Sequence, residues 1–380
     1  SKQQGTISSY TLNELPMISK GLELNAFRAP TDNDKQVDGD WYQKGLYQMT
    51  LEPGHWNVRK EDNKVTLQIE NLYRGKTGFD YRTNIEYTVA ADGSILVNST
   101  IIPSTKGVII PRIGYRMELP EGFERMRWYG RGPLENYVDR KDATYVGVYD
   151  ELVSDQWVNY VRAQEMGNRE DLRWISITNP DGIGFVFIAG DKMSASALHA
   201  TAQDMVDSAN HRRLLHKYEV PMRKETVLCL DANQRPLGNA SCGPGPMQKY
   251  ELRSQPTVFS FIILPLERSY STEELIKKAR VQMPVCMPVL IERDNNGYLN
   301  LKTNTPGATV HYSLNGGEEK IYTERFEFIS GGHVEAYAVS EQLGKSAGTS
   351  AEFPIYVDRS LWKIVSVSSE NGGEEARNAI

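Results

Sequence analysis

Alternating apolar and polar residues, the pattern of half-buried β-strands, recur along most of the chain. The alternation is clear at 64–73, 81–90 and 94–103, and Asp92–Gly93 between the last two stretches has the composition of a tight hairpin turn. A further pair of strand patterns at 173–190 turns where the chain reads NPDG. Strands joined in succession by short turns predict antiparallel sheets.

One helix interrupts this pattern. In YSTEELIKKAR at 270–280, Ser271 or Thr272 can cap the helix, acidic residues follow in the first turn, and basic residues close the last turn. The prolines of VQMPVCMPVL at 281–290 then favour an extended linker, so we expect a domain boundary near residue 281. Strands do not alternate with long amphipathic helices, which argues against a (β/α)8 barrel of about 250 residues.

Beyond the linker, strand patterns return at 289–357. A stretch of this size predicts a small β-sandwich, close to the lower size limit of a self-supporting core. The last stretch, 358–380, offers one strand pattern and a polar tail. Because a single strand cannot bury its apolar face alone, we interpret this stretch as the beginning of a further module.

Composition narrows the classes of partner. The formal net charge of the 380 residues is −6, so the chain lacks the basic footprint of a nucleic-acid-binding protein. No apolar run approaches the length of a membrane span, and residues 1–10 lack the order of a signal peptide. Cys229, Cys242 and Cys286 have neither the number nor the spacing of a disulfide framework or a metal site, so we expect free thiols.

Five motifs follow one another in the first two thirds of the chain. They are NAFRAPTDND at 25–34, WYGRGPLENYVDRKDATYVGVY at 128–149, YVRAQEMGNREDLRW at 160–174, HRRLLH at 211–216 and LDANQRPLGNASCGPGPMQKY at 230–250. In order, spacing and wording, residues 1–267 resemble the carboxy-terminal domain of bacterial β-galactosidases of the second glycoside hydrolase family.

The resemblance implies an all-β fold. Residues 1–267 would form a large antiparallel supersandwich that is similar to galactose mutarotase, residues 268–282 a helix and proline-rich linker, and residues 283–357 a small immunoglobulin-like β-sandwich. PGATVHYSLNGGEE at 306–319 resembles a module appended to chitobiases, and 358–380 resembles the truncated start of a discoidin-like, galactose-binding module. In the family, one or two strands precede the segment that opens this chain, so we expect the first strands to be missing.

Catalysis is expected elsewhere in such an enzyme. A retaining β-galactosidase works with two carboxylic acids about 5 Å apart. In the family both are glutamates of a barrel domain, which no part of this sequence matches. We therefore expect no catalytic residue, cofactor or metal site in this chain, and an isolated chain that is inactive. Divalent or sodium ions that the family uses would belong to the missing barrel domain, which would be a partner of this region.

The resemblance instead implies a supporting role at the site of the β-galactoside substrate. In the family, the loop after the RAP-DND motif reaches the rim of the active site and can move, and it corresponds here to residues 34–41. Acids accept hydrogen bonds from sugar hydroxyls, an indole covers the apolar face of a sugar ring, and Gly39 would give hinge freedom. A glycine- and proline-rich loop at 239–246 is the second contributor. The predicted rim residues are Asp34, Lys35, Asp38, Gly39, Asp40, Trp41, Asn239, Ser241 and Cys242.

Cys242 departs from the family pattern, because some members carry a tryptophan at this position that stacks on the sugar. Another aromatic residue such as Trp41 could take over the stacking, or the site could prefer a different aglycone. The alternative is a buried thiol that acts as a small hydrophobic side chain.

The motifs also hold many charged residues, which are costly to bury unless they are paired. Arg28 could pair with Asp32 or Asp34 and fix the turn behind Pro30. The other charges would form a hydrogen-bonded network that shapes the concave face, or else contact the barrel domain directly. The predicted structural network is Arg28, Asp32, Asn33, Arg131, Glu135, Arg140, Arg162, Glu165 and Arg169.

Two other functions remain open. One is a free-standing carbohydrate-binding protein, and the other is a mutarotase-like aldose epimerase, which needs histidines and a carboxylate as acid and base. His211 and His216 are five residues apart and would point to opposite faces of one strand, which argues against the epimerase. The appended modules favour an extracytoplasmic enzyme by analogy. Finally, a sheet edge left without its first strands predicts self-association into a homo-oligomer.

Overall fold

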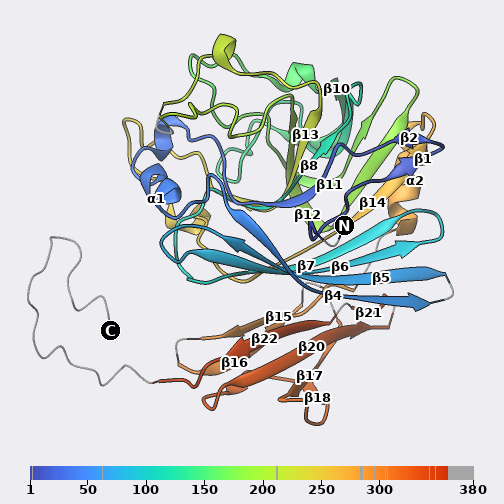
Figure 1. The fold of residues 1–380 in the computed structure, drawn as a ribbon, viewed down its shortest axis with the longest axis vertical. Helices are drawn as coiled ribbons and strands as arrows, with labels where there is room; N and C mark the ends of the chain where they lie inside the picture. Colours follow the sequence, from blue (N-terminus) through green and yellow to red (C-terminus); the bar gives the residue numbers. More distant parts are fainter. Residues whose placement is uncertain are drawn as a thin grey trace, which may run out of the picture. The chain divides into compact units, whose positions relative to one another are not determined.

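The computed structural model describes residues 1, 3–61, 63–210, 213–282, 286–294, 296–303, 305, 307–341, 343–346 and 348–357. The chain divides into two compact units, Ser1–Val285 and Cys286–Ile380 (Figure 1). The stretch 358–380, which we interpret as the beginning of a further module, lies outside the described residues.

The first unit is built on a twelve-stranded antiparallel sheet. Nine strands run in the order β10-β9-β11-β12-β14-β7-β6-β5-β4, and β13, β8 and β3 continue from β12 in a branch. The strands are β3 (Lys20–Asn25), β4 (Thr50–Glu61), β5 (Lys64–Arg74), β6 (Asp80–Ala90), β7 (Ile95–Pro103), β8 (Arg112–Leu119), β9 (Arg125–Gly132), β10 (Tyr145–Leu152), β11 (Arg169–Thr178), β12 (Ile183–Leu198), β13 (Thr226–Gln234) and β14 (Thr257–Glu267). The predicted all-β class and large antiparallel sheet are confirmed.

The remaining elements of this unit are short. A hairpin of β1 (Thr11–Leu12) and β2 (Leu15–Pro16) precedes the sheet, and the α-helices are α1 (Asp38–Gln43) and α2 (Thr272–Gln282). Four 3-10 turns lie in the loops: η1 (Asp32–Asp34), η2 (Ser154–Gln156), η3 (Lys217–Glu219) and η4 (Gln248–Tyr250). None of the helices in the described part of the chain has the length and apolar character needed to cross a membrane.

The long strand β12 belongs to both layers of the curled sheet. Its first half pairs with β14 from Ile183 to Ala189, and its second half pairs with β13 from Ser194 to Leu198. Register shifts in its pairing with β11, on both sides of Leu172, bend the ladder between these halves. The branch β13-β8-β3 therefore folds over the main sheet and encloses the core.

Aromatic side chains from both layers meet in this core. The rings of Tyr115 on β8 and Phe259 on β14 stack with centroids 6.4 Å apart, and the Tyr115 hydroxyl bonds to Ser99 on β7. Phe185 and Phe187 on β12 are fully buried beside them. Burial of such large apolar surfaces is the main term that favours this fold.

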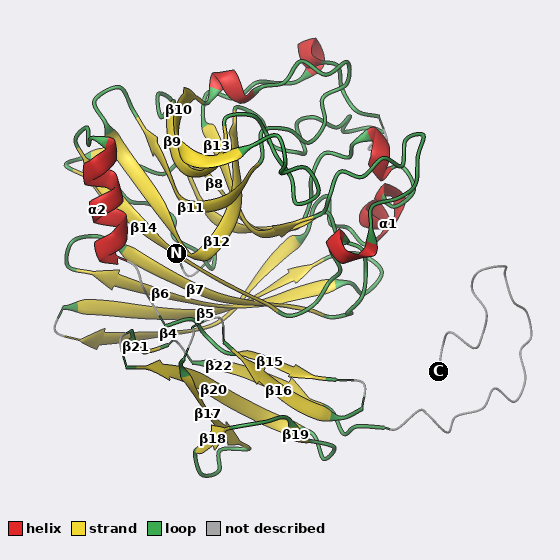
Figure 2. Cartoon of the chain, turned by 180° about the vertical axis from the view of Figure 1, so that it is seen from behind, coloured by secondary structure: helices red, strands yellow, loops and turns green. Residues whose placement is uncertain are grey.

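Helix α2 packs on the outer face of the main sheet, beside β14 (Figure 2). Ser271 is the cap: its backbone N–H donates to Glu274 Oε2 at 2.7 Å, and its Oγ accepts from the Glu274 N–H at 3.2 Å. Leu275 and Ala279 are buried in one apolar cluster with Trp174. The helix that the sequence places in a linker is thus part of the packing of the first unit.

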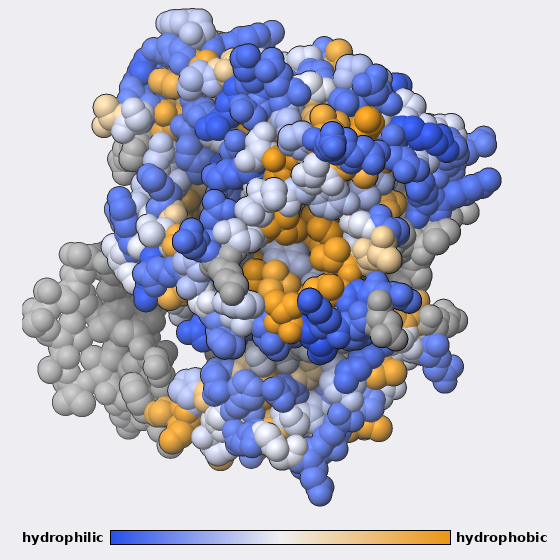
Figure 3. Space-filling model, turned by 45° about the vertical axis from the view of Figure 1, so that its right-hand side comes forward, coloured by the Kyte–Doolittle hydropathy of each residue, from blue (hydrophilic) through white to orange (hydrophobic). Residues whose placement is uncertain are grey.

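The edge strand β4 is largely exposed to solvent. Its Trp56 and Val58, with Val65 on β5 and Val89 on β6, are between 36% and 42% exposed. They lie on the face that also carries the core residue Ile69, because Trp56 and Ile69 are cross-strand partners. Apolar residues also gather in a hollow of the first unit on the face drawn in Figure 3. The apolar inner surface therefore continues to an open edge of the sheet.

The second unit is a small β-sandwich of two sheets, as predicted. One sheet has the order β15-β16-β19, and the other has the order β18-β17-β20-β21 with β22 also paired to β20. Val289, Leu299 and Val334 are fully buried in its core. The strands are β15 (Leu290–Arg293), β16 (Tyr298–Lys302), β17 (Thr309–Leu314), β18 (Lys320–Tyr322), β19 (Phe326–Glu327), β20 (Gly332–Ser340), β21 (Gly344–Lys345) and β22 (Thr349–Phe353).

If α2 stabilises the first unit by packing, Leu275→Ala should lower its free energy of unfolding by about 2–5 kcal/mol, because the truncation leaves a cavity against Trp174. Glu273→Ala on the exposed side of the same helix is the control and should change it by less than about 0.5 kcal/mol. Urea unfolding followed by tryptophan fluorescence measures both. Equal effects of the two substitutions would show that the helix contributes only through its backbone.

Candidate functional site

The site begins with a buried ion pair inside the first motif. Arg28 and Asp34 are both fully buried, and Arg28 Nη2 lies 2.7 Å from Asp34 Oδ1. Asp34 Oδ2 also accepts the backbone N–H of Thr31 at 2.9 Å, which closes the 3-10 turn η1. Of the two partners that the sequence left open for Arg28, the structure selects Asp34. Asp32 is instead at the surface, where it pairs with Lys35 at 2.8 Å.

A second arginine joins this pair to a loop far away in the sequence. Arg235 Nη1 lies 2.6 Å from Asp34 Oδ1, and Arg235 Nε lies 2.7 Å from Glu251 Oε1. In return, Arg28 donates to the carbonyl oxygens of Arg235 at 2.5 Å and Pro236 at 3.1 Å. Three contacts between arginines and carboxylates hold their partners in one geometry, since each charge would be costly to bury alone.

Asn33 links the same two loops at the surface of the protein. Its Nδ2 donates to the Gly238 carbonyl at 2.9 Å, and its Oδ1 accepts the Ser241 N–H at 2.9 Å. The Gly238 carbonyl also accepts from Arg140 at 2.8 Å, and Asp139 accepts the Gly238 N–H at 2.8 Å. Gly238 has a φ of +64°, a conformation that favours glycine. The loop 238–246 is thereby clamped at its base.

The exposed part of this clamped loop carries three predicted rim residues. Asn239, Ser241 and Cys242 are all exposed, and the Ser241 hydroxyl lies 3.8 Å from Cys242 Sγ. The alternative of a buried thiol is therefore wrong for Cys242, because its side chain is a free and exposed cysteine. The loop therefore exposes the Asn239 amide, the Ser241 hydroxyl and the Cys242 thiol along with backbone groups. It has no aromatic ring at position 242.

Two of the predicted rim residues are not at the surface, which corrects the prediction for them. Trp41 is fully buried, and its Nε1 donates to the Ile109 carbonyl at 3.1 Å, so its indole offers no face to a sugar in this structure. Asp34 is buried between its two arginines. The physical reasons differ: the apolar indole of Trp41 on α1 completes the core beneath the loop, whereas Asp34 is buried because two arginines neutralise its charge.

The other residues of that segment stay accessible. Lys35 is exposed, and Asp38, Gly39 and Asp40 are half-buried. Gly39 lies within the helix α1 and not in an irregular loop, and Asp40 pairs with Lys44 one turn later at 3.0 Å. Helix α1 thus holds Asp38 and Asp40 near the surface. Gly39, the predicted hinge, has the regular backbone of a helix.

A second buried charge cluster lies under the site, on β8 and β13. Arg112 Nη2 lies 2.5 Å from Asp231 Oδ2, and Arg112 Nη1 lies 3.4 Å from Glu165 Oε2. Burial raises the pKa of Asp231 to about 7, because loss of water outweighs the attraction of Arg112. Burial by itself would lower the pKa of Arg112, but Asp231 and Glu165 beside it outweigh this effect and raise the pKa well above its ordinary value.

The later motifs form hydrogen bonds within the loops that surround the site. Glu135 accepts from the Tyr160 hydroxyl at 2.6 Å and from the Gly167 N–H at 2.7 Å. Arg131 donates to Asp171 at 2.5 Å, and Arg162 donates to the Leu214 carbonyl at 2.9 Å. Arg169 donates to Gln156 at 2.6 Å and stacks over the Trp128 ring. Together with the contacts of Arg28, Asn33, Arg140 and Glu165 described above, they place all the predicted network residues except Asp32 in bonds between separate segments of the chain.

Of the two histidines of the epimerase alternative, the structure describes only His216. His211 lies outside the described residues, and His216 Nδ1 contacts the Val161 carbonyl at 2.8 Å while its ring stacks on Tyr218. Across the described ranges, no group of three or more His, Cys, Asp or Glu side chains is gathered as a metal site requires.

Sequence reasoning missed five charged residues of the site: Arg112, Asp139, Asp231, Arg235 and Glu251. A usable signal existed for Asp231, which directly follows the apolar run VLCL, and the strand residues before it are all buried. A carboxylate at such a position needs a buried cationic partner. The identity of that partner could not be read from the sequence, because Arg112 lies 119 residues away.

Replacement of Asp34 should be far more damaging than replacement of its neighbour Asp32. Asp34→Asn leaves Arg28 buried without a carboxylate and Arg235 with Glu251 alone, and it should lower the free energy of unfolding by about 3–5 kcal/mol. Asp32→Asn removes only an exposed pair and should cost less than about 1 kcal/mol. Chemical denaturation of the two variants decides the matter, and a similar loss for both would contradict the buried pairing.

The titration of Asp231 makes a second prediction. The folded pKa of about 7 lies above the ordinary value of 3.8, so the bound proton stabilises the folded state fully below pH 3.8, and this contribution is lost as pH rises through 7. The free energy of unfolding of the wild type relative to Asp231→Asn should fall by a few kcal/mol between these pH values, at about 1.4 kcal/mol per pKa unit. Urea titrations at several pH values measure the difference, and a constant difference would refute the raised pKa.

Comparison with known proteins gives relatives of one kind. Residues 1–263 match the family described as "Beta galactosidase small chain". A β-galactosidase of Staphylococcus xylosus is 26% identical over 263 residues, 68% of this chain and 26% of the relative. A β-galactosidase of Priestia megaterium is 32% identical over 190 residues, 49% of this chain and 18% of the relative. The chain thus spans about a quarter or less of the length of these curated relatives.

Among solved structures, a protein of Escherichia coli K12 assigned as an aldose 1-epimerase is 10% identical, with 70% of this chain and 94% of that chain covered and a TM-score of 0.36. This similarity is too low to support an inference. The family match covers most of the first unit, including all five motifs, both loops that Asn33 joins and both buried charge clusters. Over residues 1–263, this chain belongs to the β-galactosidase small-chain family.

Proposed function

We propose that this chain is a non-catalytic part of a retaining β-galactosidase and completes the rim of its sugar site. Its partners are the β-galactoside substrate and the barrel domain of the same enzyme, and the active acids belong to that domain. The family match over residues 1–263 supports the β-galactosidase assignment. The observation that carries the rim assignment is the double hydrogen bond of Asn33 to the loop 238–246.

The rim role follows from how this loop is held. A binding loop recognises a ligand best when its backbone is fixed before the ligand arrives, because less conformational entropy is then lost on binding. Asn33, Arg140 and Asp139 fix the base of the loop, and the buried Arg28–Asp34 pair fixes Asn33 in turn. The loop then presents exposed polar groups that suit sugar hydroxyls. With cysteine at 242 and Trp41 buried, recognition by this loop rests on hydrogen bonds and not on stacking.

The buried carboxylates of the site support a non-catalytic role. A glycosidase acid must reach the glycosidic oxygen, and its nucleophile must reach the anomeric carbon. Asp34 is bound by two arginines, and Asp231 is held by Arg112, and both carboxylates are fully buried. Neither is therefore accessible to a glycoside, and both serve the geometry of the loops.

Two measurements test the proposal directly. The isolated chain should not hydrolyse a chromogenic β-galactoside, whereas the whole polypeptide that contains this region should do so. Hydrolysis by the isolated chain would refute the non-catalytic assignment. Tight galactose binding by the isolated chain, without turnover in the whole polypeptide, would instead favour a free-standing carbohydrate-binding protein.

In the whole enzyme, Asn33→Ala should raise KM about tenfold and leave kcat within about threefold, because loss of two hydrogen bonds loosens a binding loop and not the reacting groups. Asn33→Asp keeps the acceptor for the Ser241 N–H and should restore part of the affinity. Asn57→Ala on the exposed strand β4 is the control and should leave both constants unchanged. Steady-state kinetics measure all three, and an unchanged KM in Asn33→Ala would overturn the rim assignment.

A further inference from the structure

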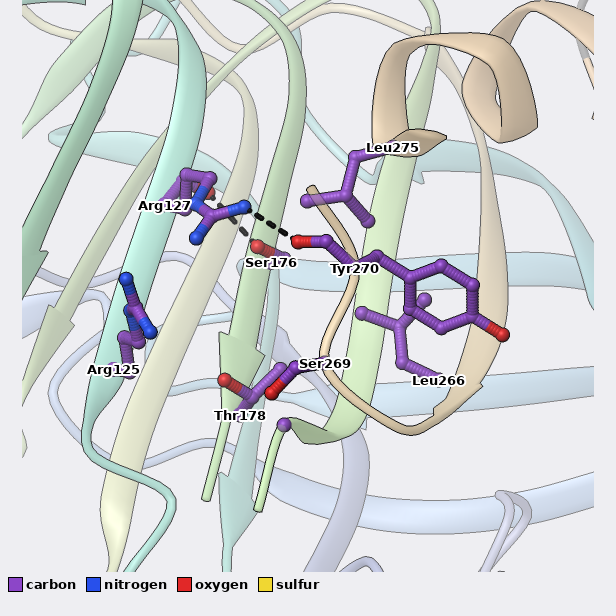
Figure 4. Close-up of a pocket in the computed structure, with 9 residues that line it drawn as sticks. Arg125, Arg127, Ser176, Thr178, Leu266, Ser269, Tyr270 and Leu275 are labelled. Carbon is purple, nitrogen blue, oxygen red and sulfur yellow. Dashed lines mark hydrogen bonds between the residues drawn. The ribbon is translucent and has the colours of Figure 1, made fainter. Parts of the chain in front are cut away.

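We propose that the outer face of the first unit carries a binding site for a small carboxylate, between β9, β11 and the turn that leads into α2. A cavity of about 30 Å³ lies there (Figure 4). It is lined by Arg125, Arg127, Ser176, Thr178, Gly182, Leu266, Ser269, Tyr270 and Leu275. None of these residues belongs to the loops at the proposed rim, so this site is independent of the proposed function.

The cavity lies where β11, β12 and β14 are neighbours in the sheet. Thr178 on β11 pairs with Gly184 on β12, which pairs in turn with Leu266 on β14. A Cβ atom at Gly184 would come within 2.1 Å of the Ile177 carbonyl oxygen, so no larger residue fits. Thr178 and Leu266 line the cavity from β11 and β14, and Ser269 and Tyr270 line it from the turn before α2.

Two arginines form the polar wall and already bind one carboxylate of the protein. Arg125 donates to Asp150 through Nε at 2.9 Å and Nη2 at 2.7 Å, and Arg127 Nε donates to the same carboxylate at 2.9 Å. Arg127 Nη1 is held against the Tyr270 carbonyl at 2.9 Å. Two positive charges thus share one negative charge, which leaves one positive charge in excess at the cavity wall.

Unused donors point to the same place. Within the described part of the chain, Arg125 Nη1 and the Thr178 hydroxyl make no side-chain hydrogen bond. Arg125 and Thr178 are cross-strand partners, so their side chains lie on one face of the sheet, as Figure 4 shows. A guanidinium edge beside a hydroxyl is a suitable donor set for an oxyanion.

The opposite wall decides between oxyanions. Leu266 and Leu275 face the arginines across the cavity, with the ring of Tyr270 beside them. A phosphate would direct some of its oxygens at these apolar side chains, whereas a carboxylate with a short aliphatic tail places oxygens on the arginine side and carbon on the leucine side. A water molecule needs about 10–15 Å³ of such space, so the cavity suits a ligand of about the size of propionate.

Titration of the whole chain with sodium propionate, at ionic strength held constant with sodium chloride, tests the site. Amide NMR signals of Gly182 and Ser269 should shift and saturate with a dissociation constant on the order of 1 mM, a limit set by so few ligand atoms. Inorganic phosphate in the same buffer should bind at least tenfold more weakly.

Two variants and one matched control locate the binding. Arg125→Gln and Thr178→Val should each weaken propionate binding, the first at least tenfold, because it removes a charged donor. Arg74→Gln is the control: Arg74 also pairs with two acids, Glu52 and Asp80, and its side chain is 49% exposed against 51% for Arg125. It should leave the binding unchanged.

Three results would overturn the proposal. They are the absence of saturable shifts at Gly182 and Ser269, equal weakening by Arg74→Gln and Arg125→Gln, and binding of phosphate as tight as that of propionate. The first two would show that no site is formed there, and the third would show a general anion surface in place of a carboxylate site. Thr178→Val changes no charge, so it keeps the test valid if Arg125→Gln disturbs the ion pair with Asp150.

Discussion

The rest of the site depends on a single fully buried carboxylate, that of Asp34. It accepts from Arg28 six residues before it and from Arg235 two hundred and one residues after it. Charges in a protein interior are tolerated only where each finds its partner, since the lost hydration is otherwise not recovered. This requirement sets the distance between the first motif and the loop after β13 more tightly than apolar contact could, because ion pairs are directional and apolar contacts are not.

Strand β13 carries this constraint into the sheet. Asp231 within the strand holds Arg112 on β8, and Arg235, one residue beyond its end, holds Asp34 and Glu251. The backbone of β13 therefore pairs with β12 and with β8. Asp231 and Arg235 each belong to a different buried charge cluster. The loop 238–246 begins three residues after Arg235, so the buried ion pairs of Arg235 fix where the loop starts. A loop whose start is fixed in this way suits the rim role that we propose.

The two faces of the sheet are stabilised by different kinds of contact. On the loop side, polar groups are buried and paired, and specificity comes from hydrogen-bond geometry. On the outer face, α2 packs on Trp174 and Val186 through apolar contacts, and a cavity lies beside Arg125 and Arg127. The loop side is part of the region that matches the β-galactosidase small-chain family, whereas α2 lies beyond the matched residues.

The sequence by itself determined the strands, the single long helix of the first unit and the all-β class, because alternation of period two and helix caps are local signals. It also pointed to Arg28, Asn33 and the loop 239–246 through the family motifs. Only the tertiary structure decided which acid pairs with Arg28, that Trp41 and Asp34 are buried, and that Arg112, Asp231 and Arg235 complete the site. These facts depend on contacts between residues that are far apart in the chain, and a one-dimensional pattern records neither the distance between such residues nor the water that is excluded between them.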